Sequence, residues 1–65
     1  MKIKCTSYLS LGLFAIDEGS LWVIDGIKYN KDKKNSVVRI LEQNSESPMW
    51  AEIPQVILAE YFEIA

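Results

Sequence analysis

Two runs of β-branched and aromatic residues stand out in the hydrophobic pattern of the chain. Residues 21–29 and 36–42 are both rich in the residue types that favour β-strands. The segment 30–35 between them contains only Asn, Lys and Asp, which is the composition of a solvent-exposed hairpin loop. The pattern therefore predicts a central β-hairpin, preceded by a polar turn in which Gly19 is able to adopt a positive φ.

Shorter elements are expected on both sides of this hairpin. Residues 1–7 alternate, with Ile3 and Cys5 on one side and lysines on the other, which predicts a half-buried strand. Residues 49–53 predict another short strand. Pro54 ends it, because proline has no N–H to donate to a sheet.

The remaining segments complete a small all-β domain. Residues 8–16 are apolar but interrupted by a serine and a glycine, so we expect a packed, irregular loop. Residues 55–61 follow a proline and carry apolar residues at helical spacing, which predicts one or two helical turns. Residues 62–65 predict a final short strand. The whole chain, residues 1–65, is then a single domain of about five strands with one short helical turn before the last.

The layout of these elements resembles that of SH3-like barrels, in which a tight turn precedes the central strands and a short helical turn precedes the last one. Three segments are also similar to short uncharacterised proteins from phages and mobile elements of Gram-positive bacteria: residues 19–23 (Gly-Ser-Leu-Trp-Val), 50–54 (Trp-Ala-Glu-Ile-Pro) and 60–63 (Glu-Tyr-Phe-Glu). The resemblance implies a small SH3-like barrel and an accessory protein. The Ala-Leu-Tyr-Asp-Tyr-like run of peptide-binding SH3 domains is absent, so binding of proline-rich peptides does not carry over.

Composition argues against an enzyme. A chain of 65 residues builds one small core, with little room for a substrate cavity. Histidine is absent and Cys5 is the only cysteine, so the usual general base, an internal disulfide and a cysteine-rich metal site are all missing. No catalytic or nucleotide-binding motif is present. We therefore expect a non-enzymatic protein without a cofactor or metal, in which Cys5 is a buried apolar residue.

Aromatic residues are numerous for so small a core. The chain contains seven large rings, more than such a core holds, so some are expected at the surface. Exposed aromatic residues are enriched at the energetic centres of protein interfaces. We therefore predict a protein-interaction module whose partner is another protein or, as a homodimer, a second copy of the chain. The expected anchors are Trp22, Trp50 and Tyr61, with Glu52 and Glu60 in a polar rim.

Charge is distributed unevenly and leaves two alternatives open. Residues 28–39 carry five basic residues and one acidic residue, whereas residues 40–65 carry five glutamates and no basic residue. The basic segment is a candidate for nucleic-acid binding, although a net charge of −2 disfavours that partner. The acidic segment is a candidate inhibitor surface against a host nucleic-acid enzyme. The residues concerned are Lys31, Lys33, Lys34 and Arg39 for the first alternative, and Glu52, Glu60 and Glu63 for the second.

The chain contains no candidate membrane segment. No stretch approaches the roughly 20 apolar residues of a membrane span. Residues 9–16 follow two lysines and loosely imitate a signal peptide, but Ser10 and Gly12 interrupt the apolar run. We therefore expect a cytoplasmic protein that does not enter a membrane.

Overall fold

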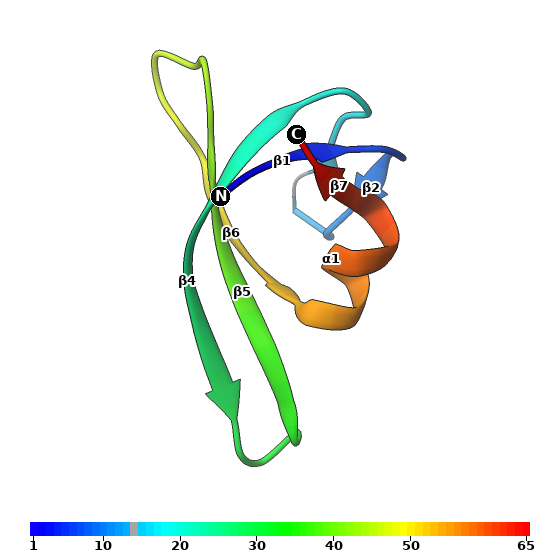
Figure 1. Cartoon of the computed structure of the whole chain (residues 1–65), viewed down its shortest axis with the longest axis vertical. Coiled ribbons are helices and arrows are strands. Elements are labelled where there is room, and N and C mark those ends of the chain that lie inside the picture. Colours follow the sequence, from blue (N-terminus) through cyan, green and yellow to red (C-terminus); the bar gives the residue numbers. More distant parts are fainter. Residues whose placement is uncertain (14) are drawn as a thin grey trace.

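The computed structural model describes residues 1–13 and 15–65, and these residues form a mainly β structure with one short helix (Figure 1). Phe14, one of the seven rings counted above, lies outside the described residues. The all-β class predicted from the sequence is confirmed. The elements are β1 (Lys2–Cys5), β2 (Leu9–Ser10), β3 (Ala15–Ile16), β4 (Leu21–Asn30), β5 (Asn35–Glu42), β6 (Trp50–Pro54), α1 (Gln55–Tyr61) and β7 (Phe62–Ile64).

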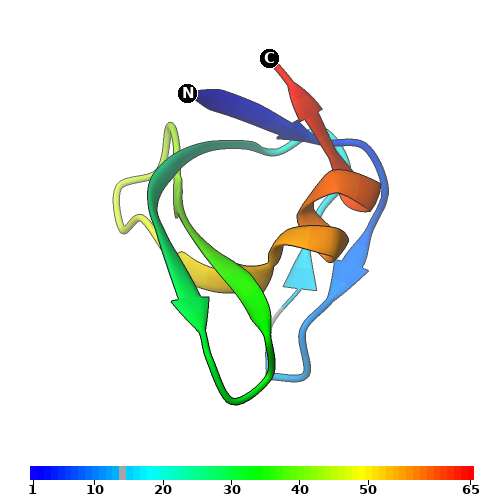
Figure 2. The ribbon, with the colours of Figure 1, turned by 60° about the horizontal axis from the view of Figure 1, so that its bottom comes forward.

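Five strands form one antiparallel sheet in the order β6-β5-β4-β1-β7. β4 and β5 are the predicted central hairpin, and they extend as a long arm away from the rest of the molecule (Figures 1 and 2). β1 pairs with β4 on one side and with β7 on the other, so the two ends of the chain lie in neighbouring strands. The predicted late helix and final strand are confirmed.

The segment 8–16 is more regular than the sequence predicts. β2 and β3 pair with each other in a separate two-stranded sheet, in which Leu9 lies opposite Ile16. Both side chains are buried, so they anchor this sheet to the core. Gly12 lies between the two strands with φ +86°. The expectation of an irregular loop is therefore wrong, because the buried pair holds the two arms of the segment together.

The inner face of the large sheet carries the hydrophobic core. β5 and β6 contribute Val38, Ile40 and Ile53, each no more than 1% exposed. Ile3 and Trp22, paired across β1 and β4, extend the same cluster. Full burial of an aliphatic side chain of this size contributes about 1.5–3 kcal/mol. Most of the stability of so small a domain therefore comes from this one face.

Helix α1 covers the open side of the core. It begins directly after Pro54, which ends β6 as predicted and has a φ of −55°. Its seven residues are too few for a helix that is stable in isolation. Ile57, Leu58 and Tyr61 pack against the buried cluster, so tertiary contacts hold the helix in place.

β4 contains a β-bulge at Asp25. Ile24 lies opposite Ile40 and Gly26 lies opposite Arg39, so Asp25 is the additional residue on β4. Asp25 and Gly26 consequently both lie on the outer face, the side of the sheet away from the core.

The bulge shifts the alternation of side chains along the rest of β4. Ile24, before the bulge, lies on the inner face, and Ile27, after it, also lies inward because it is opposite the buried Val38. Ile27 and Tyr29 are nevertheless 68% and 60% exposed, because the hairpin extends beyond the core. The arm therefore presents uncovered apolar side chains on its inner side.

Candidate functional site

The outer face of the sheet carries a row of apolar side chains. The strand register places Val23, Leu41 and Trp50 side by side across β4, β5 and β6. Val23 and Leu41 are half-buried, while Trp50 is 53% exposed. Trp50 is therefore the most accessible large residue of the row. Together with three charged residues beside it, this row forms a surface that we call the outer-face site: Val23, Asp25, Arg39, Leu41, Trp50 and Glu52.

Arg39 lies over the ring of Trp50. Its guanidinium carbon is 4.4 Å from the ring centroid, which is the geometry of a cation–π contact. Arg39 Nε also lies 3.7 Å from Asp25 Oδ2, on the bulge of β4. A contact on the ring and an ion pair on the neighbouring strand together restrict the Arg39 side chain. The indole is therefore presented in a supported orientation with part of its surface open to solvent.

A charged cavity adjoins this pair. It has a volume of about 400 Å³, and four charged side chains line it: Asp25, Lys28, Arg39 and Glu52. Gly26 contributes no side chain, and the position that a Cβ would occupy is open space. The outer-face site therefore combines an apolar row with a neighbouring hollow that contains charges of both signs.

The structure brings together three residues that the sequence analysis places in two different predicted sites, a protein interface and a nucleic-acid interface. Trp50 and Glu52 were expected in a protein interface, and Arg39 in a nucleic-acid interface. Arg39 and Glu52 are cross-strand partners, and Leu41 and Trp50 form the next pair along the same two strands. The supporting residues Val23 and Leu41 were missed, although their signal is present in the alternation of β4 and β5.

Trp22 lies in the core and is removed from the candidate contact residues. It is 3% exposed and lies opposite Ile3, on the inner face of the sheet. Its Nε1–H donates a hydrogen bond to Ser20 Oγ at 2.9 Å. A partner would therefore reach this ring only if the core opened.

Tyr61 and Glu60 belong to α1 and do not join Trp50. Tyr61 is half-buried against the core, on the inner side of the sheet. Its carbonyl accepts hydrogen bonds from Thr6 N–H at 2.7 Å and from Thr6 Oγ1 at 3.0 Å. Glu60 is exposed on the helix. These two residues are separated from the outer-face site by the sheet itself.

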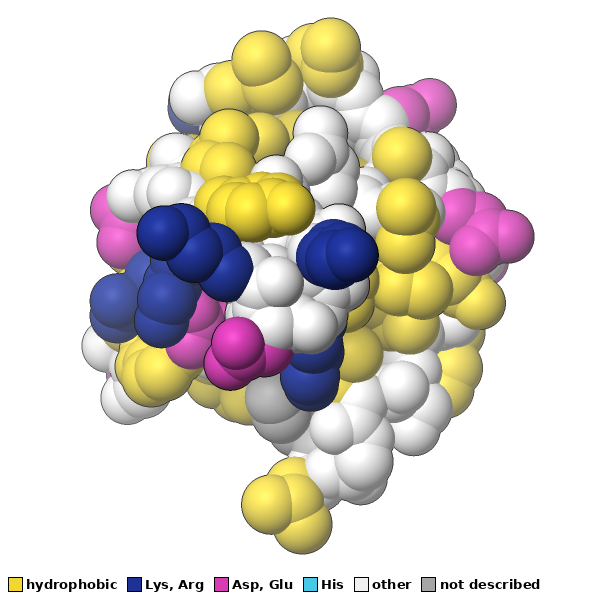
Figure 3. All heavy atoms as spheres, turned by 90° about the horizontal axis from the view of Figure 1, so that it is seen from below, with side chains coloured by type: hydrophobic (Ala, Val, Ile, Leu, Met, Phe, Trp, Pro, Cys, Tyr) yellow, Lys and Arg dark blue, Asp and Glu magenta, His cyan; other side chains and the backbone are white. Residues whose placement is uncertain are grey.

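The lysines of the hairpin loop lie at the far end of the arm. Asn30 Oδ1 accepts hydrogen bonds from the backbone N–H groups of Asp32 and Lys33, which fixes the turn. Lys34 lies five residues before Arg39 on an extended chain, a separation of about 16 Å. Figure 3, a view onto this end, shows basic side chains next to hydrophobic ones. The four predicted basic residues, Lys31, Lys33, Lys34 and Arg39, therefore do not form one patch.

Cys5 is a core residue, as predicted. It is fully buried, and its Sγ–H donates to the Ser7 carbonyl at 2.9 Å. Burial raises the pKa of the thiol, and the charges of Glu18 and Asp17 raise it further, which outweighs the lowering by the Ser7 hydrogen bond. The described residues also contain no group of three or more His, Cys, Asp or Glu side chains suited to a metal ion.

Comparisons of the chain with protein-family models, with curated proteins and with solved structures give no match. Within the described residues, no helix has the length and hydrophobicity needed to cross a bilayer.

Proposed function

We propose that this chain is a non-enzymatic protein-interaction module with an SH3-like barrel fold, and that the outer-face site is its contact surface. The strand order β6-β5-β4-β1-β7 supports the fold, since β2 and β3 are inserted before the central strands and α1 precedes the last strand. The sequence resemblance to small phage and mobile-element proteins supports a role as an accessory protein.

The observation that carries the function is the supported, half-exposed indole of Trp50. Tryptophan and arginine are the residues most enriched at the energetic centres of protein interfaces. Here they contact each other, with the ring centroid 4.4 Å from the guanidinium carbon. The apolar Leu41 next to Trp50 widens the surface that a partner would bury, and Glu52 provides a charged rim.

A protein partner fits this surface better than the two alternatives do. Nucleic-acid affinity depends on many neutralised phosphates. At the outer-face site, however, Arg39 is accompanied by the acidic Asp25 and Glu52. The inhibitor hypothesis needs one continuous acidic surface, whereas Glu52 lies opposite Arg39 and Glu63 lies opposite Lys4 on the neighbouring strands.

The test is affinity capture from a cell lysate with three immobilised proteins: the wild type, Trp50→Ala and Tyr8→Ala. Tyr8 is a matched control because it is an aromatic residue with 60% exposure outside the outer-face site. A protein enriched by the wild type is then purified, and its affinity for each variant is measured. We expect Trp50→Ala to weaken binding at least tenfold, which corresponds to about 1.4 kcal/mol, and Tyr8→Ala to leave it unchanged.

Two results would contradict this function. Equal binding by the wild type and Trp50→Ala would remove the outer-face site as the contact surface. Loss of the captured material after nuclease treatment of the lysate would show that a nucleic acid, and not a protein, is the primary partner.

A further inference from the structure

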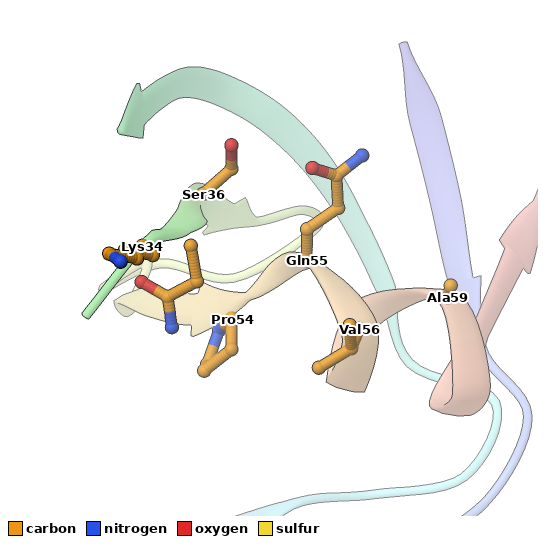
Figure 4. A pocket seen from close by; sticks show the side chains of 7 residues that line it. Lys34, Ser36, Pro54, Gln55, Val56 and Ala59 are labelled. Carbon is orange, nitrogen blue, oxygen red and sulfur yellow. The ribbon is translucent and has the colours of Figure 1, made fainter. Parts of the chain in front are cut away.

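A second surface lies where β5 continues past the end of β6, next to α1 (Figure 4). It is a groove of about 410 Å³, within the size range of small-ligand and peptide-side-chain pockets. We call it the α1 groove. It is on the opposite side of the sheet from the apolar row of the outer-face site. Its lining includes Lys34, Asn35, Ser36, Pro54, Val56 and Ala59.

One edge of this groove is the end of the ladder between β5 and β6. The ladder between β5 and β6 ends at Val37 and Pro54, where the chain turns into α1. Glu42 N–H donates to the Met49 carbonyl at 2.8 Å, and hydrogen-bonded positions alternate along an antiparallel pair. The alternation directs the N–H and C=O of Ser36 towards the space beyond β6. The pairing of Val37 with Pro54 places the Gln55 N–H on the Ser36 C=O, so the Ser36 N–H is the group left without a strand partner among the described residues.

Asn35 adds a second group that lacks a partner. Its Oδ1 is shielded from solvent and has no hydrogen-bond partner among the described residues. Buried polar atoms are nearly always satisfied in folded proteins. Rotation of the Asn35 side chain would expose this oxygen to a donor in the groove, and the hydrogen bond formed would be one that the free protein lacks.

The wall of the groove opposite this edge is apolar. Pro54, Val56 and Ala59 line it, and Val56 is 74% exposed (Figure 4). Tyr29 lies opposite Ser36 on β4 and is 60% exposed, so an aromatic residue is present on the strand next to this edge. These uncovered apolar side chains provide a surface on which an aliphatic side chain of a ligand can pack.

The hairpin end of the groove is positively charged. Lys34 lines the groove directly, and Lys31 and Lys33 are exposed in the same loop, with Asp32 as its only acidic residue. Charge complementarity therefore favours a ligand with a carboxylate at this end.

We propose that the α1 groove binds an extended peptide that carries an acidic side chain next to an aliphatic one. A carbonyl of the peptide backbone accepts a hydrogen bond from the Ser36 N–H at the point where β6 leaves the sheet, as in the recognition mode known as β-augmentation. The aliphatic side chain packs on Val56 and Ala59, and the carboxylate contacts Lys34. This proposal does not depend on the outer-face site, which is on the other side of the sheet.

The experiment is selection from a random peptide display library on four immobilised proteins: the wild type, Ala59→Arg, Lys34→Glu and Tyr8→Ala. Ala59 and Lys34 are exposed, so both changes are compatible with folding, which circular dichroism verifies. Ala59→Arg fills the groove and also adds a positive charge. The added charge by itself would favour acidic peptides, so a loss of these peptides would be due to the filled groove. The most enriched peptide is then synthesised and titrated into ¹⁵N-labelled protein.

We expect peptides with Asp or Glu next to Val, Ile or Leu to be enriched on the wild type and on Tyr8→Ala, and depleted at least tenfold on Ala59→Arg. On Lys34→Glu the preference should change from acidic to basic peptides. In the titration, the amide signals of Ser36 and Asn35 should shift in a saturable manner, and those of Leu41 and Trp50 should not.

Three outcomes would overturn the proposal. The first is an equal yield on the wild type and Ala59→Arg. The second is enrichment that does not respond to the charge at Lys34. The third is sedimentation of the free chain as a dimer that Ala59→Arg dissociates, because the occupant of the groove would then be a second copy of the chain.

Discussion

Trp22 and Trp50 lie in the same sheet, separated by one strand, yet their surroundings are opposite. Trp22 is 3% exposed in the core, and its indole N–H is bonded to Ser20. Trp50 is 53% exposed, with the guanidinium of Arg39 over one side of its ring. The comparison shows that residue type does not determine the role of an aromatic side chain in this small domain. The role of each ring depends on the face of the sheet that carries it, because the rest of the chain covers one face and leaves the other open.

The largest expected effect is a difference in stability between the two tryptophans. Trp22→Ala removes a fully packed ring and should destabilise the fold by about 3–5 kcal/mol. Trp50→Ala removes exposed surface and should change the free energy of unfolding by less than about 1 kcal/mol. Urea denaturation followed by far-UV circular dichroism measures both, with Trp22→Phe as a milder variant that keeps a measurable transition. Similar values for the two alanine variants would contradict the assignment of faces.

The hydrogen bond of Trp22 provides a smaller test of the same contrast. Ser20→Ala removes the acceptor 2.9 Å from Trp22 Nε1 and leaves the N–H of a buried ring unsatisfied. The expected loss of stability is about 1–2 kcal/mol. Ser10→Ala, at an exposed serine in β2, is the control and should have little effect. No difference between the two variants in urea denaturation would mean that the indole N–H has another partner.

The hairpin loop belongs to neither face, and its backbone makes a separate prediction. Lys34 has a φ of +51°, in the left-handed region where a Cβ is unfavourable. Lys34→Gly should therefore stabilise the protein by about 0.5–1 kcal/mol. Lys33→Gly is the matched control, since Lys33 does not have a positive φ, and it should destabilise slightly. The measurement is the midpoint of thermal unfolding, and a lower midpoint for Lys34→Gly would contradict the loop geometry.

The smallest expected effect on stability concerns Arg39. Its ion pair with Asp25 is 3.7 Å long and both side chains are about half exposed, so Arg39→Ala should change the free energy of unfolding by less than about 0.5 kcal/mol. The environment of Trp50 should change more clearly, because one side of its ring becomes uncovered. Acrylamide quenching of Trp50, measured with Trp22→Phe in both proteins, should increase. Unchanged quenching would show that Arg39 does not shield the ring in solution.

Much of the fold could be predicted from the sequence, because period-two patterns and polar loops are local signals. The central hairpin, the strand that ends at Pro54 and the late helix all appear as expected. The pairing of β2 with β3 was missed, because each strand has only two residues and no alternation is visible at that length.

The division of the tryptophans between the two faces could not be predicted from the sequence. β4 has apolar residues on both sides, with Leu21 and Val23 alternating with Trp22 and Ile24. Local pattern therefore does not decide which pair is inward. That choice depends on Ile3, which contacts β4 from a distant part of the sequence. For the same reason, the meeting of Arg39, Trp50 and Glu52 depends on strand register and has no signature along the chain.

The additional residue in β4 links the two proposed binding surfaces. If Asp25 took a regular place in the ladder, the side chains that follow it would exchange sides, so that Lys28 would point inward and Tyr29 would join the outer face. The bulge prevents this exchange, because it accommodates the additional residue without moving any later residue from its partner on β5. A deletion of the Asp25 codon would therefore leave the amino acids of both recognition surfaces on their present faces, so evolution of this protein can change the length of β4 at this point while both specificities are kept.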